Sequence, residues 1–244
     1  MIPQRIYYVW FGKNKKPDNI RNNIASWKKE NPDFQIIEIN ESNFDVCKYK
    51  FTEKAYESQD WAYVSDVARI DTLFNNGGFY LDTDVELIKS IEPLRNARSV
   101  WGLENSDAIN TGLILGSEKG NKTLKELLDI YSKITFKHEL KNHLVTVPIV
   151  TNYFLKHGFR KINRYQILEN DAHIYPVEYF APLHYWGGGK ISKKTIAVHH
   201  YAGSWVENNI QWKKYNKEWV KKELILKVPS LFFKVKKMKQ SLTL

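Results

Sequence analysis

The sequence predicts an α/β protein with a doubly wound, mostly parallel sheet flanked by helices, and two observations carry this prediction. Segments rich in β-branched and aromatic residues alternate with segments whose apolar residues recur at helical spacing, and this alternation is typical of parallel strands joined by helices. The 244 residues are 43% hydrophobic and 26% charged, which is the composition of a folded chain with a large core.

The N-terminal region supplies a strand, a helix and a second strand. Residues 5–12, RIYYVWFG, are rich in β-forming residues. Ile20, Ile24 and Trp27 follow at i, i+4 and i+7, so they share one face of a helix. Asn31-Pro32 ends that helix, and residues 34–39, FQIIEI, resume as a strand.

A second helix is expected over residues 60–76, where four apolar side chains form one stripe. Gly77 is placed to cap this helix, and Gly78 turns the chain into a strand over residues 79–88, FYLDTDVELI. Further strands are expected at 99–104, 111–116 and 195–201, and further helices at 121–134 and 143–158.

Asp82 and Asp84, separated by Thr83, are the first candidate site. Side chains two residues apart on an extended segment point to one side, with Cα atoms about 6.5–7 Å apart. Two such carboxylates repel unless a cation joins them or one is protonated. Carboxylate oxygens suit Mg²⁺ or Mn²⁺, which commonly complete their shell with substrate phosphates. A lone Asp-x-Asp is also frequent by chance and fits a surface turn.

Asp66 and Arg69 stand at i and i+3 on the helix that leads into the carboxylate strand. They therefore share a helix face, which points to a charged pair near the same site. A surface ion pair of little energetic consequence is the alternative interpretation.

The C-terminal residues carry much of the formal charge of +10. No acidic residue follows Glu223, while lysines interleave with Leu231, Phe232, Phe233 and Val235. This predicts a domain over residues 1–223 and a basic amphipathic tail over 224–244 that lies on an anionic membrane surface. A solvated basic tail explains the pattern equally well.

The single cysteine, Cys47, excludes an internal disulfide framework and favours a reducing compartment. No apolar run reaches the roughly 18 residues that a membrane span requires, and the N-terminus lacks a secretory signal pattern. We therefore expect a cytoplasmic protein, peripheral on the inner face of the cell membrane if the tail binds lipid.

Together these motifs resemble the DXD-containing glycosyltransferases of family 32, which include bacterial capsule and lipopolysaccharide sugar transferases and yeast initiating mannosyltransferases. The chain is also similar to the catalytic domain of clostridial glucosylating toxins. The matching segments are IYYVWFG at 6–12, SDVARIDTLFNNGGFYLDTDVE at 65–86, NTGLILG at 110–116 and HHYAGSW at 199–205. The resemblance implies a GT-A fold, a nucleotide-sugar donor, a divalent metal and retention of anomeric configuration.

The resemblance also implies roles for individual residues. Asp84 resembles the direct metal ligand, and Asp82 a contact to the donor ribose or sugar and to the metal. Asp66 and Arg69 would bind sugar hydroxyls and phosphates of the donor. Asn110, with Asp107, is a candidate beside the sugar, or part of a solvated turn.

Other family positions concern the nucleotide. Val9 and Trp10 would form the base-binding edge, and Tyr80 would pack against the nucleotide. In the HHYAGSW segment, Ser204 and Trp205 would contact the diphosphate.

The two adjacent histidines point to opposite faces if their segment is extended, so one of them can reach the metal. We prefer His200, with His199 as the alternative. An imidazole ligand favours Mn²⁺ over Mg²⁺. The alternative interpretation is that both histidines are ordinary strand-end residues with no role in metal binding. We would prefer it if Gly-Ser-Trp did not follow them.

The expected function is transfer of a hexose or N-acetylhexosamine from a nucleotide sugar, with uridine favoured, to a saccharide or lipid-linked saccharide acceptor in surface polysaccharide synthesis. We expect that the protein supplies no nucleophile. Tyr185 and Trp186 are expected to form either a mobile lid over the acceptor or an exposed aromatic loop. One alternative is a metal-dependent sugar-phosphate or nucleotide hydrolase. Another is a basic nucleic-acid-binding module, which leaves Asp66, Asp82 and Asp84 without a role.

Overall fold

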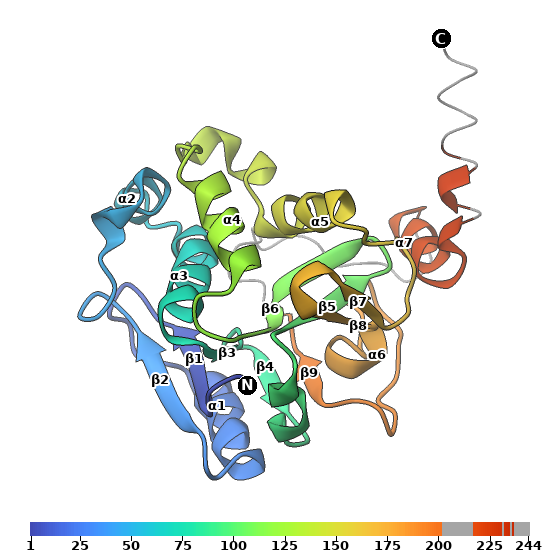
Figure 1. Ribbon diagram of the computed structural model, residues 1–244, viewed down its shortest axis with the longest axis horizontal. Helices are drawn as coiled ribbons and strands as arrows, with labels where there is room; N and C mark the ends of the chain where they lie inside the picture. Colours follow the sequence, from blue (N-terminus) through green and yellow to red (C-terminus); the bar gives the residue numbers. More distant parts are fainter. Residues whose placement is uncertain (202–216, 231, 235, 237–244) are drawn as a thin grey trace.

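A computed structural model describes residues 1–201, 217–230, 232–234 and 236 of the chain (Figure 1). Its centre is a seven-stranded sheet with the strand order β2-β1-β3-β6-β5-β8-β7. The strands are β1 (Arg5–Val9), β2 (Gln35–Ile39), β3 (Gly78–Tyr80), β5 (Ser99–Asn105), β6 (Ala108–Ser117), β7 (Gln166–Leu168) and β8 (Ala172–Tyr175). The pairings make β6 and β7 antiparallel to their neighbours and leave the other five strands in one direction. The predicted α/β class with a mostly parallel sheet is confirmed.

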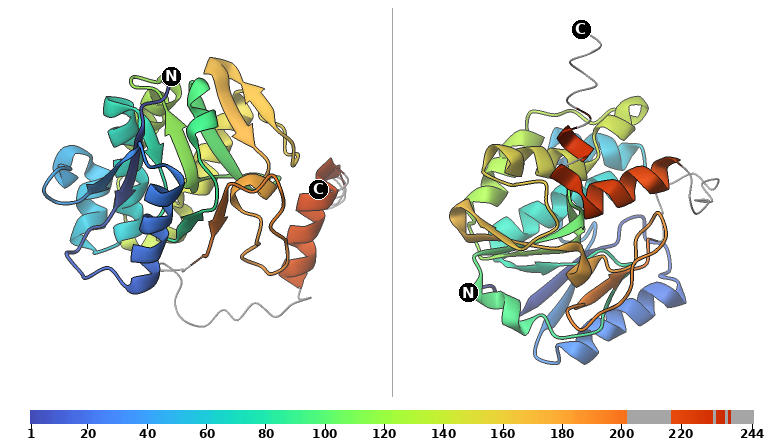
Figure 2. Two further views of the ribbon diagram at one scale, coloured as in Figure 1. Left: turned by 90° about the horizontal axis from the view of Figure 1, so that it is seen from below. Right: turned by 90° about the vertical axis from the view of Figure 1, so that its right-hand side faces the viewer.

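Helices cover both faces of this sheet (Figure 2). On one side lie α2 (Lys50–Glu57), α3 (Trp61–Asn76), α4 (Lys122–Tyr131) and α5 (Thr146–Lys156), and on the other α1 (Asp18–Glu30). The remaining helices are the short α6 (Val177–Phe180), α7 (Lys217–Lys227) and the 3₁₀ turns η1 (Val46–Lys48), η2 (Glu92–Asn96), η3 (His138–His143) and η4 (Glu169–Asp171). Within the described ranges, no helix combines the length and the apolar character needed to cross a bilayer.

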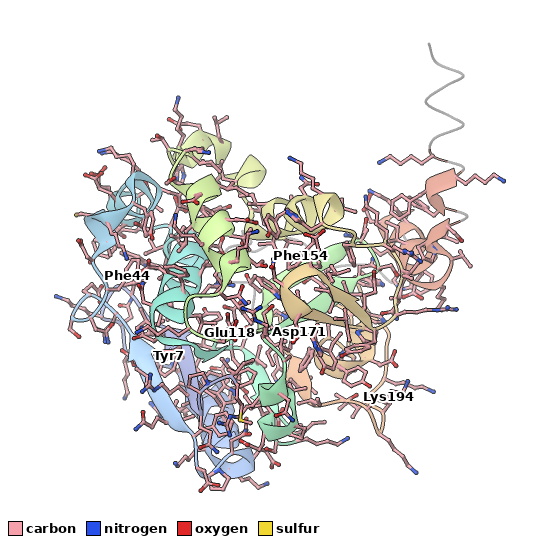
Figure 3. All side chains as sticks on the ribbon, in the orientation of Figure 1. Tyr7, Phe44, Glu118, Phe154, Asp171 and Lys194 are labelled. Carbon is pink, nitrogen blue, oxygen red and sulfur yellow. The ribbon has the colours of Figure 1, made fainter. Side chains whose placement is uncertain are left out.

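The buried core packs against the central sheet, and Figure 3 labels Tyr7 and Phe154 among its members. Tyr7 on β1 and Phe154 on α5 are 5% and 1% exposed, so apolar packing extends from one half of the sheet to the other. Trp101 on β5 packs edge-on against Phe154 with ring centroids 4.8 Å apart. Such burial of aromatic side chains is the main source of stability in a core of this kind.

The α3 helix ends as its sequence predicts. Gly77 adopts a φ of 66°, and its N–H donates to the carbonyl of Leu73 at 2.8 Å. A side chain at this position would be strained in that backbone conformation and would lie 2.8 Å from the backbone nitrogen of Lys119. The glycine therefore fixes where α3 stops and where β3 begins.

The prediction of one continuous strand over residues 79–88 is wrong, because a turn interrupts it at residues 81–84. β3 ends at Tyr80, and a separate β4 (Val85–Leu87) begins after a turn and pairs with β9 (Ala197–His199). The Val85 N–H donates to the carbonyl of Asp82 at 3.0 Å and closes the turn. Asp82 and Asp84 thus occupy a turn rather than one face of an extended segment.

The boundary expected at residue 223 falls inside α7. Ile225 is 3% exposed, and the carbonyl of Leu226 accepts a 3.0 Å hydrogen bond from the Ser106 hydroxyl. The residues around 224–227 therefore pack on the domain. Of the expected tail, Leu231, Val235 and residues 237–244 lie outside the described residues.

Candidate metal and donor site

The Asp82–Asp84 turn lies at the edge of the sheet where β1 and β3 end and β6 begins. Its backbone is tied to β6, since the Asp82 N–H donates to the Gly112 carbonyl at 2.9 Å. Two side chains of α1 hold its far side: the Asn23 amide donates to the Thr83 carbonyl at 2.9 Å, and the Trp27 indole N–H donates to the Val85 carbonyl at 2.8 Å. The turn is therefore fixed from both sides.

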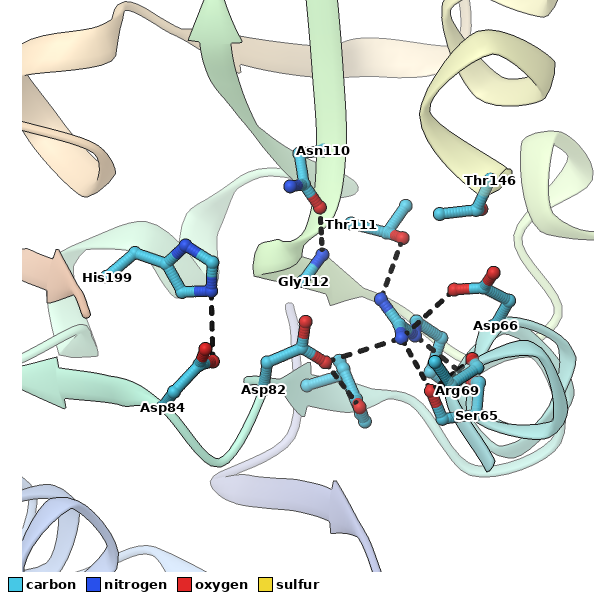
Figure 4. A network of polar contacts seen from close by, with 12 residues as sticks. Ser65, Asp66, Arg69, Asp82, Asp84, Asn110, Thr111, Gly112, Thr146 and His199 are labelled. Atoms are coloured by element: carbon cyan, nitrogen blue, oxygen red, sulfur yellow. Dashed lines mark hydrogen bonds and ion pairs between the residues drawn. The ribbon is translucent and has the colours of Figure 1, made fainter. Parts of the chain in front are cut away.

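Asp82 is oriented by three neighbours (Figure 4). The Tyr80 hydroxyl donates to its Oδ1 at 2.7 Å, and an Arg69 guanidinium nitrogen lies 3.3 Å from the same oxygen. A Cβ added at Gly112 would lie 1.9 Å from Asp82 Oδ2. Glycine at position 112 therefore provides the space that the carboxylate occupies.

Arg69 is the buried centre of the network, with 3% of its surface exposed. It donates to the Ser65 carbonyl at 3.1 Å, the Ser65 hydroxyl at 2.8 Å and the Thr111 hydroxyl at 3.1 Å. It also pairs with Asp66 at 3.1 Å. The expected i, i+3 pair exists, and it is a buried ion pair rather than a surface one.

One guanidinium serves two carboxylates, Asp66 and Asp82. Burial raises the pKa of Asp66 to about 7, because the Arg69 charge only partly offsets the loss of water and the Asp82 charge adds to it. While Asp66 holds its proton, Asp82 is the carboxylate that balances the Arg69 charge.

Asp84 and His199 form the second half of the site. His199 Nε2 lies 2.9 Å from Asp84 Oδ1, and the imidazole is 7% exposed. Burial works against the imidazolium, but the Asp84 carboxylate outweighs it and raises the pKa of His199. The Nδ1 atom of His199 is buried and finds no hydrogen-bond partner among the described parts of the chain.

Asp82, Asp84 and His199 can each point one ligand atom into a common space, with these atoms within 4.8 Å of one another. Two carboxylate oxygens and one imidazole nitrogen are a donor set that fits Mn²⁺ and, less well, Mg²⁺. The residues present therefore fit the divalent metal that the sequence resemblance implies.

The structure favours His199 over His200 for this set. The two side chains point to opposite faces as expected, but His200 is exposed and its Nε2 lies 3.0 Å from Glu86. The pairing of β9 with β4 places His199 opposite Val85, which turns its ring toward Asp84. The preference for His200 is replaced by its alternative.

Asn110 lies at the start of β6 and connects the site to a residue that sequence reasoning missed. Its Oδ1 accepts from the Gly112 N–H at 2.7 Å, and its Nδ2 donates to Glu104 at 3.2 Å. Glu104 stands where the β5–β6 register is interrupted between Leu103 and Asn105, and such bulges redirect side chains. Burial raises the pKa of Glu104.

The three residues expected to contact the nucleotide, Val9, Trp10 and Tyr80, lie in two different environments. Val9 ends β1 and Trp10 follows it, next to the chain leaving β3, because the Leu81 N–H donates to the Tyr7 carbonyl at 3.1 Å. Tyr80, expected against the nucleotide, is 2% exposed and has the Arg69 guanidinium 4.6 Å from its ring centroid. Its ring is covered by protein, so in this structure it supports Asp82.

Two further expectations concern the chain after β8. Ser204 and Trp205 lie outside the described residues. Trp186, expected in a lid or exposed loop with Tyr185, is 1% exposed, stacks on His184 at 4.6 Å and donates to Glu223 of α7 at 2.9 Å. Trp186 is therefore a packing residue that joins its own loop to α7.

Comparison with known proteins bears on this geometry. Residues 17–101 match the family described as "Glycosyltransferase sugar-binding region containing DXD motif". This segment includes Asp66, Arg69, Asp82 and Asp84, whereas Glu104, Asn110 and His199 lie beyond it.

"Subversion of eukaryotic traffic protein A" of Legionella pneumophila is 25% identical over 162 residues, which cover 52% of this chain and 24% of that protein. The chain thus spans about a quarter of this relative's length.

Structural comparison aligned the chain with two solved structures. "PaToxG Glycosyltransferase" aligns with a TM-score of 0.51 and 16% identity over 64% of this chain and 69% of that one. A glycosyltransferase involved in glycosylation of the major capsid of PBCV-1 aligns with a TM-score of 0.41 and 12% identity over 81% and 93%. The PaToxG alignment supports the GT-A type of α/β fold.

Proposed function

We propose that this chain is a DXD-type glycosyltransferase that moves a hexose or N-acetylhexosamine from a nucleotide sugar to a saccharide acceptor. The family match over residues 17–101 supports this proposal. The observation that carries the proposal is the convergence of Asp82, Asp84 and His199 on one space, directly beside the buried Arg69.

The chemical difficulty is the negative charge that builds on the leaving diphosphate as the anomeric bond breaks. A divalent metal, when bound, neutralises part of that charge as a Lewis acid. Asp82 and Asp84 with His199 would hold it. The Tyr80 hydroxyl and Arg69 keep Asp82 in one orientation, so the ligand set is organised before substrate arrives.

The sugar would lie on the β5–β6 side of these ligands. Asn110 faces this side, and Glu104 adds a carboxylate beside it. The expected contacts of Asp66 and Arg69 with donor hydroxyls and phosphates remain part of the proposal. Because both side chains are buried, we assign them first to the positioning of Asp82.

We further propose a uridine nucleotide, with Val9 and Trp10 at the end of β1 beside the base, and retention through attack on the same face of the sugar. Both rest on the family resemblance. The same resemblance supports an acceptor in surface polysaccharide synthesis, including a lipid-linked saccharide at the inner membrane face.

The test is a panel of UDP-glucose, UDP-galactose and UDP-N-acetylglucosamine with Mn²⁺, read by release of UDP with and without added saccharides. We expect Mn²⁺-dependent release that a saccharide accelerates and that Asp84→Asn abolishes. Glu86→Gln, two residues away on an exposed side chain paired with His200, is the matched control and should retain activity. Release that no saccharide in the panel accelerates would favour the hydrolase instead.

A further inference from the structure

The outer face of α7 carries exposed apolar side chains in a regular row. Val220, Leu224 and Val228 are 45%, 43% and 39% exposed. They stand at i, i+4 and i+8, so they lie on one side of the helix and its first following residue. Lys221 and Lys227, whose side chains are 50% and 70% exposed, flank this row. We call these five residues the outer α7 face.

The opposite side of α7 holds the helix on the domain. The Asn105 amide donates to the Lys222 carbonyl at 3.3 Å, and the Ser106 hydroxyl donates to the Leu226 carbonyl at 3.0 Å. The Trp186 indole N–H donates to Glu223 at 2.9 Å, and Ile225 is buried beneath the helix. The apolar row is therefore not the side by which α7 packs, and folding of the domain does not account for it.

The sequence from α7 onward has a net positive charge. From residue 217 to the end, the sequence has eight lysines and two glutamates. Both glutamates are paired within the helix, Glu218 with Lys221 at 3.4 Å and Glu223 with Lys227 at 2.8 Å. An apolar row between lysines, with a net positive surround, is typical of a helix that lies in the interface of an anionic bilayer.

We propose that the outer α7 face lies on an anionic lipid surface. Val220, Leu224 and Val228 enter the boundary between headgroups and acyl chains, and Lys221 and Lys227 meet the lipid phosphates. A purely basic surface for nucleic acid would not need the three apolar side chains, which makes lipid the better match.

This contact would orient the candidate site. Asn105, which α7 holds through Lys222, is the neighbour of Glu104 on the β5–β6 hairpin. The hairpin that carries Asn110 would therefore be fixed near the membrane, on the side from which a lipid-linked acceptor arrives. This orientation rests on the proposed function, whereas the lipid contact itself does not.

The experiment is sedimentation of the full chain with phosphatidylcholine vesicles that contain either 30% phosphatidylglycerol or none, without nucleotide sugar. We expect binding to the anionic vesicles alone, with Leu224→Asp weakening it at least tenfold. Leu140→Asp is the matched control, because Leu140 is 47% exposed and belongs to η3 rather than α7. The double variant Lys221→Gln/Lys227→Gln should lose about fivefold for each lysine at low salt.

Thermal unfolding of each variant checks that the fold is intact, and Val220→Asp gives a second reading if Leu224→Asp is unfolded. The proposal is overturned if the wild-type chain ignores anionic vesicles or binds neutral ones equally. It is also overturned if Leu224→Asp and Val220→Asp bind as the wild type does, since salt-sensitive binding alone indicates a merely basic surface. The outcome is independent of UDP release, so failure of this proposal and failure of the transferase proposal are told apart.

Discussion

Replacing Gly112 by alanine should displace the Asp82 carboxylate while leaving the Asp82 side chain itself unaltered. The new Cβ would lie 1.9 Å from Oδ2 and 2.8 Å from Cγ, whereas ordinary contact begins at 3.4 Å. The carboxylate oxygen must therefore move by roughly 1.5 Å, because the backbone of β6 is fixed by its neighbours on both sides. That movement breaks the 2.7 Å hydrogen bond from Tyr80 and separates Oδ1 from Arg69.

The two consequences differ greatly in size. A displacement of about 1 Å at a reacting centre can cost roughly 100-fold in rate, so we expect UDP release to fall about 100-fold. Loss of one hydrogen bond costs about 0.5–1.5 kcal/mol of unfolding free energy, which lowers Tm by only a few degrees in a chain of this length. Gly112 has no left-handed φ, so alanine adds no backbone strain.

The assay pairs Mn²⁺-dependent UDP release with thermal unfolding for Gly112→Ala and Gly102→Ala. Gly102 lies on the neighbouring strand β5, and its added Cβ would meet the nearest atom at 3.3 Å, so this control should keep most of its activity. A folded Gly112→Ala protein with more than half of the wild-type rate would refute the assigned role of Asp82.

Three further variants probe individual residues of the site. His199→Gln should weaken Mn²⁺ binding at least about tenfold, while His200→Gln, exposed beside Glu86, should change it less than twofold; equal effects in a Mn²⁺ titration would reject the choice between the two. Glu104→Gln should lower UDP release about tenfold or more with UDP affinity nearly unchanged, and an unaltered rate would remove Glu104 from the site. Asp66 holds a proton in the folded state up to about pH 7, against a reference pKa of 3.8, so in metal-free protein the unfolding free energy should fall as pH rises from about 4 to 7. Asp66→Asn should make the unfolding free energies measured in urea at about pH 4 and about pH 7 more alike. An unchanged difference between the two pH values would contradict the raised pKa of Asp66.

Much of the fold follows from local patterns. The spacing of Ile20, Ile24 and Trp27 predicts α1, and the Gly77-Gly78 pair predicts the end of α3. The spacing of Asp66 and Arg69 predicts their contact. It does not reveal that the pair is buried, because burial depends on strands β3 and β6 packing over α3.

The parts that sequence reasoning missed depend on pairing between distant segments. Alternation along residues 197–200 shows that the two histidines face opposite ways, but the pairing of β9 with β4 decides which of them meets Asp84. Glu104 contacts Asn110 because the register of β5 and β6 shifts between Leu103 and Asn105. No residue pattern in the sequence indicates this shift. The Trp27 spacing predicts a core side chain and not its hydrogen bond to the Asp84-bearing turn.

The anchoring of α7 on the domain is also not predictable from the sequence pattern. The C-terminal run of lysines suggests a tail, yet α7 is anchored by backbone carbonyls of Lys222 and Leu226 that accept from the β5–β6 hairpin. Charge counting does not detect such contacts, since they use main-chain atoms.

The position of manganese in a crystal of the chain grown with Mn²⁺ and UDP would show directly whether Asp82, Asp84 and His199 hold the metal. We expect one anomalous peak within bonding distance of Asp84 and His199, with the diphosphate of UDP beside it and the Tyr80–Asp82–Arg69 contacts intact. Manganese and diphosphate bound elsewhere, with the Asp82–Asp84 turn and His199 unliganded, would contradict it.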